Sequence, residues 1–232
     1  LTEAQVGGLS TAQLASLETQ DLNALTGTQF GWLSTAQVVA LTTQQFAAME
    51  TADLAGFGTA QIRAIETRDL AAMETTQVNA LSANQLAALS TAQVRAIETA
   101  DIDNIGSTAL AGFSSAQVGA LTTVQLAAMG SDQLQALSQE QIAGLSTAQL
   151  AGLSTDDLNA FTVSQFGSFS TAQIAGLTAT QVGAMESADL LALSGTQIAA
   201  LQTRSIAALD SADASILTAS FVQSMTTAQI VA

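Results

Sequence analysis

The chain repeats an eight-residue unit from its first residue to its last. Written in eights from Leu1, its 232 residues form 29 octads with no insertion or deletion. Position 1 is Leu, Ile, Met or Phe in every octad, and position 6 is a large apolar residue in every octad except that of Ala214. Self-similarity at a fixed period predicts a repeat architecture. We expect residues 1–232 to form a single continuous octapeptide-repeat array and, because no distinct end repeat is seen, to be a segment of a longer chain.

Each octad is expected to hold one very short helix. Position 6 and the next position 1 are three residues apart, about one helical turn, and the residues around them favour helix. In a strand, positions 1 and 6 would lie on opposite faces. One continuous helix is also excluded, because eight residues at ~100° each overshoot two turns by ~80° and carry the apolar pair around the helix. The helix must therefore end once per octad.

Hydroxyl residues mark where each helix begins. Every octad has Ser or Thr at position 2, position 3 or both, and such side chains cap the free N–H groups of a first turn. Position 5 is Gln in 19 octads and Asp in seven. A cap at position 2 makes Gln the third residue of a capping box, as in Ser34 and Gln37. Glu is a poor cap, so in Glu50-Thr51-Ala52-Asp53 we expect Thr51 to cap. Each helix should then have roughly five to seven residues.

Helices this short must stack to survive. The prediction is an all-α solenoid of very short capped helices, with positions 1 and 6 in its core and small residues at position 8 where backbones approach. A second, 56-residue period spans seven octads and links Phe57, Phe113 and Phe169. It indicates either a whole number of superhelical turns, for example two turns of 3.5 octads, or duplication of a 56-residue segment. The two explanations are compatible.

The composition excludes several kinds of function. The net charge is −15, which argues against a nucleic-acid partner. The chain contains no run of 18 apolar residues, so we expect no membrane insertion. The chain has no His and no Cys, so Ser–His or Cys–His catalysis and ordinary zinc sites lack their residues. We therefore expect no enzyme activity, no catalytic, cofactor-binding or metal-binding residues, and no cofactor.

Some residues nevertheless require a structural test. The acid pairs Glu66/Asp69 and Glu186/Asp189 are interpreted as solvated residues at helix starts, in preference to a general acid/base pair. The densest cluster of oxygen-bearing side chains consists of Asp101, Asp103 and Asn104. This oxygen cluster lacks the glycine-bearing spacing of an EF-hand loop, which weakens its interpretation as a calcium site. Trp32 replaces a small residue and indicates a local packing irregularity or, less favoured, a contact between chains.

The stretch STAQVVALTTQQFAAMETADL resembles octapeptide-repeat tracts, of the TTAQIAAL type, in large secreted bacterial surface and adhesin-like proteins. The resemblance covers the whole chain and implies an extracellular or cell-surface location and a structural role. We expect a repeat solenoid that forms an extracellular fibre or adhesin stalk, with self-association or neighbouring repeats as its partners. The alternative is a binding module that presents a regular Thr/Gln surface to glycan, ice or protein.

Overall fold

The structure, a computed structural model, describes residues 1–232 and contains 29 α-helices and no strand. Every helix begins at position 3 of its octad and is four to six residues long. The predicted all-α fold with one short helix per octad is confirmed, and the helices are slightly shorter than expected. No helix in the chain is both long and apolar enough to cross a membrane.

The chain divides into two compact units, Leu1–Ala120 and Leu121–Ala232, and the boundary falls between two octads. The helices of the first unit are α1 (Glu3–Gly7), α2 (Thr11–Ala15), α3 (Thr19–Leu22), α4 (Gly27–Phe30), α5 (Thr35–Ala40), α6 (Thr43–Ala47), α7 (Thr51–Ala55), α8 (Thr59–Ala64), α9 (Thr67–Leu70), α10 (Thr75–Asn79), α11 (Ala83–Ala88), α12 (Thr91–Ala96), α13 (Thr99–Asn104), α14 (Ser107–Leu110) and α15 (Ser115–Ala120). Those of the second unit are α16 (Thr123–Ala127), α17 (Ser131–Gln135), α18 (Gln139–Ala143), α19 (Thr147–Ala151), α20 (Thr155–Asn159), α21 (Val163–Ser168), α22 (Thr171–Gly176), α23 (Ala179–Gly183), α24 (Ser187–Ala192), α25 (Gly195–Ala200), α26 (Thr203–Ile206), α27 (Ser211–Ile216), α28 (Ala219–Ser224) and α29 (Thr227–Ile230).

The helix starts are set by the residue at position 2. Ser34 has an extended backbone, with φ −69° and ψ 159°, and its Oγ accepts from the Gln37 N–H at 3.3 Å. In return the Ser34 N–H donates to Gln37 Oε1 at 2.8 Å, which completes the predicted capping box.

The prediction that Thr51 caps its helix is wrong. Glu50 is the N-cap, without a side-chain cap bond, and Thr51 is the first helical residue. Gly58 behaves in the same way, since it has no side chain but its N–H donates to Gln61 Oε1 at 2.7 Å. The extended backbone at position 2 therefore persists without a capping hydroxyl, because the helix register follows the repeat rather than the individual cap.

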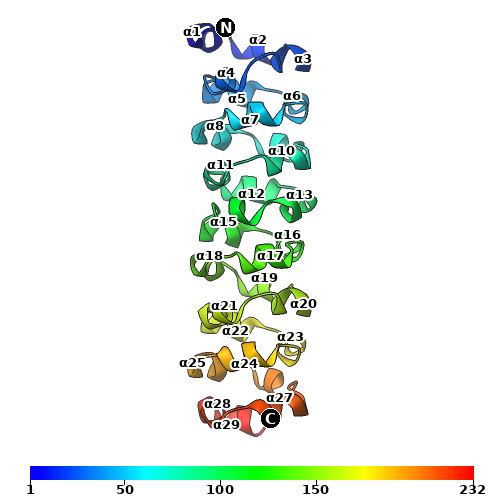
Figure 1. Ribbon diagram of the computed structural model, residues 1–232, viewed down its shortest axis with the longest axis vertical. Coiled ribbons are helices and arrows are strands. Elements are labelled where there is room, and N and C mark those ends of the chain that lie inside the picture. Colours follow the sequence, from blue (N-terminus) through cyan, green and yellow to red (C-terminus); the bar gives the residue numbers. More distant parts are fainter. The chain divides into compact units, whose positions relative to one another are not determined.

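Within each unit, helices pack on those three octads away. Such pairs include α5 with α8 and α8 with α11 in the first unit, and α18 with α21 and α22 with α25 in the second. Figure 1 shows α8, α11 and α15 on one side of the first unit, and α18, α21 and α25 on one side of the second. Side chains bond to main-chain oxygens 25 residues later and 28 and 31 residues earlier, offsets that average 28 residues, or 3.5 octads. One coil therefore takes 3.5 octads. The 56-residue period corresponds to two such coils, which was one of the explanations that the sequence left open.

The core consists of the predicted positions. Position 6 is buried from Val6 to Ile198, and position 1 is buried from Leu33 to Leu201. The pattern changes near the C-terminus, where Phe221 at position 5 is 3% exposed and the neighbouring Val222 at position 6 is 42% exposed. In that octad the larger aromatic side chain occupies the interior one residue early.

Small residues at position 8 allow backbones to meet, as predicted. A Cβ added to Gly56 would lie 1.8 Å from the Gly27 carbonyl oxygen, and one added to Gly112 would lie 2.2 Å from the Ala83 oxygen. In both pairs position 8 lies against position 3 of the helix three octads earlier. Only glycine fits where the backbones are this close.

Candidate functional site: the polar contacts between coils

The glutamine at position 5 joins each coil to the preceding one. Gln93, which is 3% exposed, accepts the Ser90 N–H at Oε1 over 2.8 Å. Its amide nitrogen donates to the main-chain oxygens of Ile62 at 2.9 Å and Ile65 at 2.8 Å. These acceptors lie 31 and 28 residues earlier, at positions 6 and 1. A single side chain thus completes a helix cap in its own octad and binds two carbonyl groups of the coil before it.

The same bridge recurs through both units. It uses two main-chain carbonyls in each case, at the offsets seen for Gln93. The glutamines for which both bonds are seen are Gln37, Gln45, Gln61, Gln77, Gln85, Gln93 and Gln117 in the first unit, and Gln165, Gln173, Gln181, Gln197 and Gln229 in the second. We call this set the glutamine ladder.

The ladder changes the sequence interpretation of position 5. The sequence alone assigns the glutamines at this position to capping boxes. Capping and the bonds between coils both occur, because the two ends of one carboxamide have opposite hydrogen-bonding character. The ladder glutamines are buried, so they do not contribute to the regular Thr/Gln surface that the binding-module alternative requires.

A second, sparser set of bonds starts at position 7. Arg63 Nε donates to the Ala88 oxygen at 3.3 Å, and Arg95 Nε donates to the Ala120 oxygen at 3.0 Å. In each case the acceptor lies 25 residues later, at position 8. Asn side chains make the same contact from Asn23 to Ala48 and from Asn159 to Ala184, each at 2.7 Å. Nothing in the octad viewed alone indicates this contact, because donor and acceptor are three octads apart.

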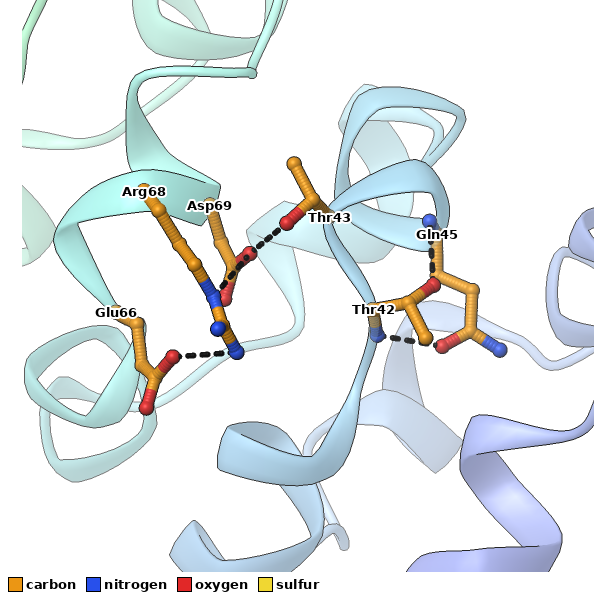
Figure 2. A network of polar contacts seen from close by, with 6 residues as sticks. All are labelled: Thr42, Thr43, Gln45, Glu66, Arg68 and Asp69. Atoms are coloured by element: carbon orange, nitrogen blue, oxygen red, sulfur yellow. Dashed lines mark hydrogen bonds and ion pairs between the residues drawn. The ribbon is translucent and has the colours of Figure 1, made fainter.

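Aspartate at position 5 behaves differently from glutamine. A carboxylate has no N–H to donate, and Asp69 instead accepts from the Thr43 hydroxyl at 2.5 Å, 26 residues away. Figure 2 shows Asp69 facing Thr43, next to the capping box of Thr42 and Gln45. Arg68 reaches back to Glu66 at 2.6 Å and lies 3.5 Å from Asp69. Because the Arg68 side chain is 67% exposed, these ion pairs add little stability.

The acid pairs are therefore not simply solvated. Asp69 is 0% and Asp189 3% exposed, whereas Glu186 is exposed and Glu66 is half-buried. The prediction is wrong for the aspartates, because position 5 points into the contact between coils while position 2 lies at its edge. Asp101 repeats the pattern, since it is 3% exposed and accepts from the Thr75 hydroxyl at 2.6 Å.

Asp53 and Asp189 have no hydroxyl residue at the corresponding place. The position that Thr43 occupies relative to Asp69 is held by Gly27 for Asp53 and by Val163 for Asp189. Burial raises the pKa of Asp53 and the Glu50 charge raises it further, while a bond from the Glu50 backbone opposes both effects. Burial, with the Glu186 charge, raises the pKa of Asp189 to about 6.

The oxygen cluster does not converge. Asp101 is buried against Thr75, Asp103 is exposed, and the Asn104 amide donates to the Ala100 oxygen of its own helix at 2.7 Å. Across the chain, no group of three or more acidic side chains is placed to hold a metal ion. Trp32 is half-buried, and its backbone N–H bonds to the Gln29 oxygen.

The helix packing and the repeated polar contacts define a helical-repeat solenoid. A family model described as the ALTTAQ repeat matches residues 14–49, 62–96, 94–131, 123–155 and 151–185. These matches cover more than half of the chain, which therefore belongs to the ALTTAQ repeat family. No curated protein matches the chain.

The six letters of the family's description correspond to one joint between helices. In this chain ALSTAQ spans residues 88–93 and ALTTQQ spans residues 40–45. They supply, in order, the small residue of position 8, the core residue of position 1, the N-cap, two first-turn residues and the ladder glutamine.

Proposed function

We propose that this chain is a structural protein, a length of solenoid that acts as a spacer in an extracellular fibre or an adhesin stalk. The glutamine ladder is the observation that carries the proposal. Its bonds end on main-chain carbonyls, which every residue type provides, so each coil offers the next the same acceptors. Such an arrangement favours a uniform array in which the number of repeats sets the length.

The extracellular setting rests on the resemblance of the octads to secreted bacterial surface tracts. It predicts that an antibody against the chain labels intact source cells. Labelling only after the cells are permeabilised would contradict it. Self-association is proposed on the same basis, and sedimentation of the purified chain over a range of concentrations tests it.

The spacer role is tested by deletions that keep or break the octad phase. Removing Leu81–Ala88 joins Ala80 to Leu89 and keeps every cap and core position in phase. Removing Leu81–Asn84 joins Ala80 to Gln85 and loses one core residue and the Ser82 cap. We expect the larger deletion to leave a folded chain and the smaller one to destabilise it strongly. Circular dichroism during urea unfolding compares the two variants.

Length is then measured directly. Removing the seven octads Leu33–Ala88 takes out two coils of the first unit, and at ~8–10 Å per layer of helices the labelled ends of that unit should approach by ~16–20 Å. Energy transfer between dyes at the two ends reports this change. A spacer displayed on cells should keep holding its reporter after any in-phase deletion. Abrupt loss of an activity when one particular octad is removed would instead indicate a single binding or catalytic site and refute the proposal.

A further inference from the structure

We infer that Asp53 and Asp189 are proton-binding points between coils, at which the solenoid is held more tightly in mildly acidic solution than in neutral solution. The inference depends on the packing alone and not on the proposed function. It starts from the position that these two residues occupy. Where position 5 holds a ladder glutamine, the side-chain amide donates to two carbonyls of the preceding coil.

The offsets of the ladder give the carbonyls that correspond to these two aspartates. For Asp53 they belong to Leu22 and Leu25, and for Asp189 to Leu158 and Phe161. An ionised carboxylate offers these oxygens no proton, so the coil contact loses its bridge and buries a charge. Asp53 is 4% exposed, and its Oδ2 is buried without any hydrogen-bond partner. Asp189 is similarly buried, at 3% exposed.

Other buried aspartates at position 5 show what Asp53 and Asp189 lack, which is a hydroxyl donor on the preceding coil. Asp69 and Asp101 are as deeply buried, but Oδ1 of each accepts from a threonine hydroxyl on the helix three octads earlier. The Asp69 Oδ2, like that of Asp53, has no partner, so the difference lies in the hydroxyl bond. Gly27 cannot be replaced by such a threonine, because a Cβ there would lie 2.5 Å from the Ala52 carbonyl oxygen. The close approach of backbones at Gly27 thus leaves Asp53 without a hydroxyl partner on the preceding coil.

The charges around the two sites are all negative. Asp53 shares α7 with the N-cap Glu50 and packs between α4, which has no charged residue, and α10, whose N-cap is Glu74. Asp189 follows Glu186 on α24 and packs on α21, which also has no charged residue.

Binding of one proton removes the buried negative charge and also supplies the missing hydrogen-bond donor. The proton comes from solvent, binds one carboxylate oxygen and provides an O–H that donates toward a carbonyl of the preceding coil. Because Asp is one methylene shorter than Gln, the protonated group replaces the glutamine bridge with at most one bond. The raised pKa values of both residues agree with this arrangement.

The sign of the pH effect follows from linkage. The pKa of the Asp189 carboxyl has its ordinary value of 3.8 in the unfolded chain, and burial raises this pKa to about 6 in the folded chain. Between these values the folded state binds more protons than the unfolded state, so stability falls as pH rises through this window and levels off above it. Asp189 therefore adds stability in acid that is lost by neutral pH, the reverse of a carboxylate held by a cation.

Val163→Thr provides the test. Thr is nearly the same shape as Val and supplies a hydroxyl at the position that Thr43 occupies relative to Asp69, so the charged carboxylate gains a donor. We expect the titration midpoint of the Asp189 carboxyl, followed by carbon NMR in the full chain, to fall by ~1 unit. The matched control is Val124→Thr, at an exposed Val in the same unit. Val124 precedes Leu150 by the same number of residues as Val163 precedes Asp189, so the new hydroxyl has no carboxylate at that place. It should leave the midpoint unchanged.

A second readout follows the coil contact itself. Amide hydrogen exchange in α21 and α24, corrected for the intrinsic pH dependence of exchange, should be more protected at pH 5 than at pH 7.5. Asp189→Asn, which is neutral at both pH values, should remove this difference. An Asp189 carboxyl that titrates below pH 4.5 in the unchanged chain would overturn the inference. So would equal shifts from Val163→Thr and Val124→Thr.

Discussion

Replacing one ladder glutamine should cost far more than removing the cap beside it. Gln93→Met keeps the length and approximate volume of the side chain but deletes its amide. The variant loses the bonds to Ile62 and Ile65, at 2.9 and 2.8 Å, and the bond from the Ser90 N–H at 2.8 Å. Two buried bonds at ~0.5–1.5 kcal/mol each, with ~1 kcal/mol for the cap, predict a loss of ~2–4 kcal/mol.

The matched control is Ser90→Ala in the same octad. It removes only the acceptor of the Gln93 N–H, at 3.2 Å, and leaves the amide bridge intact. The expected loss is ~1 kcal/mol. Urea unfolding followed by circular dichroism compares the two variants, and hydrogen exchange in α8 and α12 localises the change. If Gln93→Met costs no more than Ser90→Ala, the ladder contributes nothing to the coil contact and the reasoning fails.

Two further predictions concern the core and the backbone contacts. Leu86→Ala, at a side chain that is 0% exposed, should lower the free energy of unfolding by ~2–5 kcal/mol, measured by urea unfolding; a loss below ~1 kcal/mol would mean that position 6 does not form the core. Gly56→Ala should disrupt the first unit, because its Cβ would overlap the Gly27 oxygen, whereas Gly167→Ala in α21 meets open space and should stabilise its helix by ~0.5–1 kcal/mol. Thermal unfolding of both variants separates these outcomes, and similar melting temperatures would refute the close approach.

The parts of the fold that depend on neighbouring residues could be predicted from the sequence. The helix in each octad, the capping box of Ser34 and Gln37 and the buried positions 1 and 6 all follow from side chains close together in the chain. Such contacts are fixed by helix geometry alone. The failure at Thr51 has a related cause, since the local rule ranks capping side chains while the register of the whole array determines where the helix begins.

The polar contacts between coils could not be predicted, because they depend on the number of residues in a coil. The 56-residue period was compatible with any whole number of turns. Only the offsets of 31 and 28 residues in the ladder reduce it to two coils. Without the number of residues per coil, the sequence does not show that Asp69 and Thr43 are neighbours. It therefore gives no reason to expect a hydrogen bond that would stabilise a buried carboxylate at position 5. The buried apolar positions can be identified from residues close together in the chain, whereas the partner of a buried polar group lies about 28 residues away.

Even the correct spacing is insufficient to pair an aspartate with a hydroxyl. Ser131 has the same spacing from Asp157 as Thr43 has from Asp69, yet Asp157 Oδ2 accepts from the Ser154 hydroxyl of its own octad at 2.7 Å. The difference lies at position 2. Ser154 can donate to Asp157, whereas the octads of Asp69 and Asp101 have Glu66 and Glu98 there, which cap without a side-chain bond. An ionised Glu has no proton to give and repels a second carboxylate, so in those octads the donor comes from the neighbouring coil. The residue at position 2 therefore accounts for the difference between Asp157, which bonds within its own octad, and Asp69 and Asp101, which join two coils.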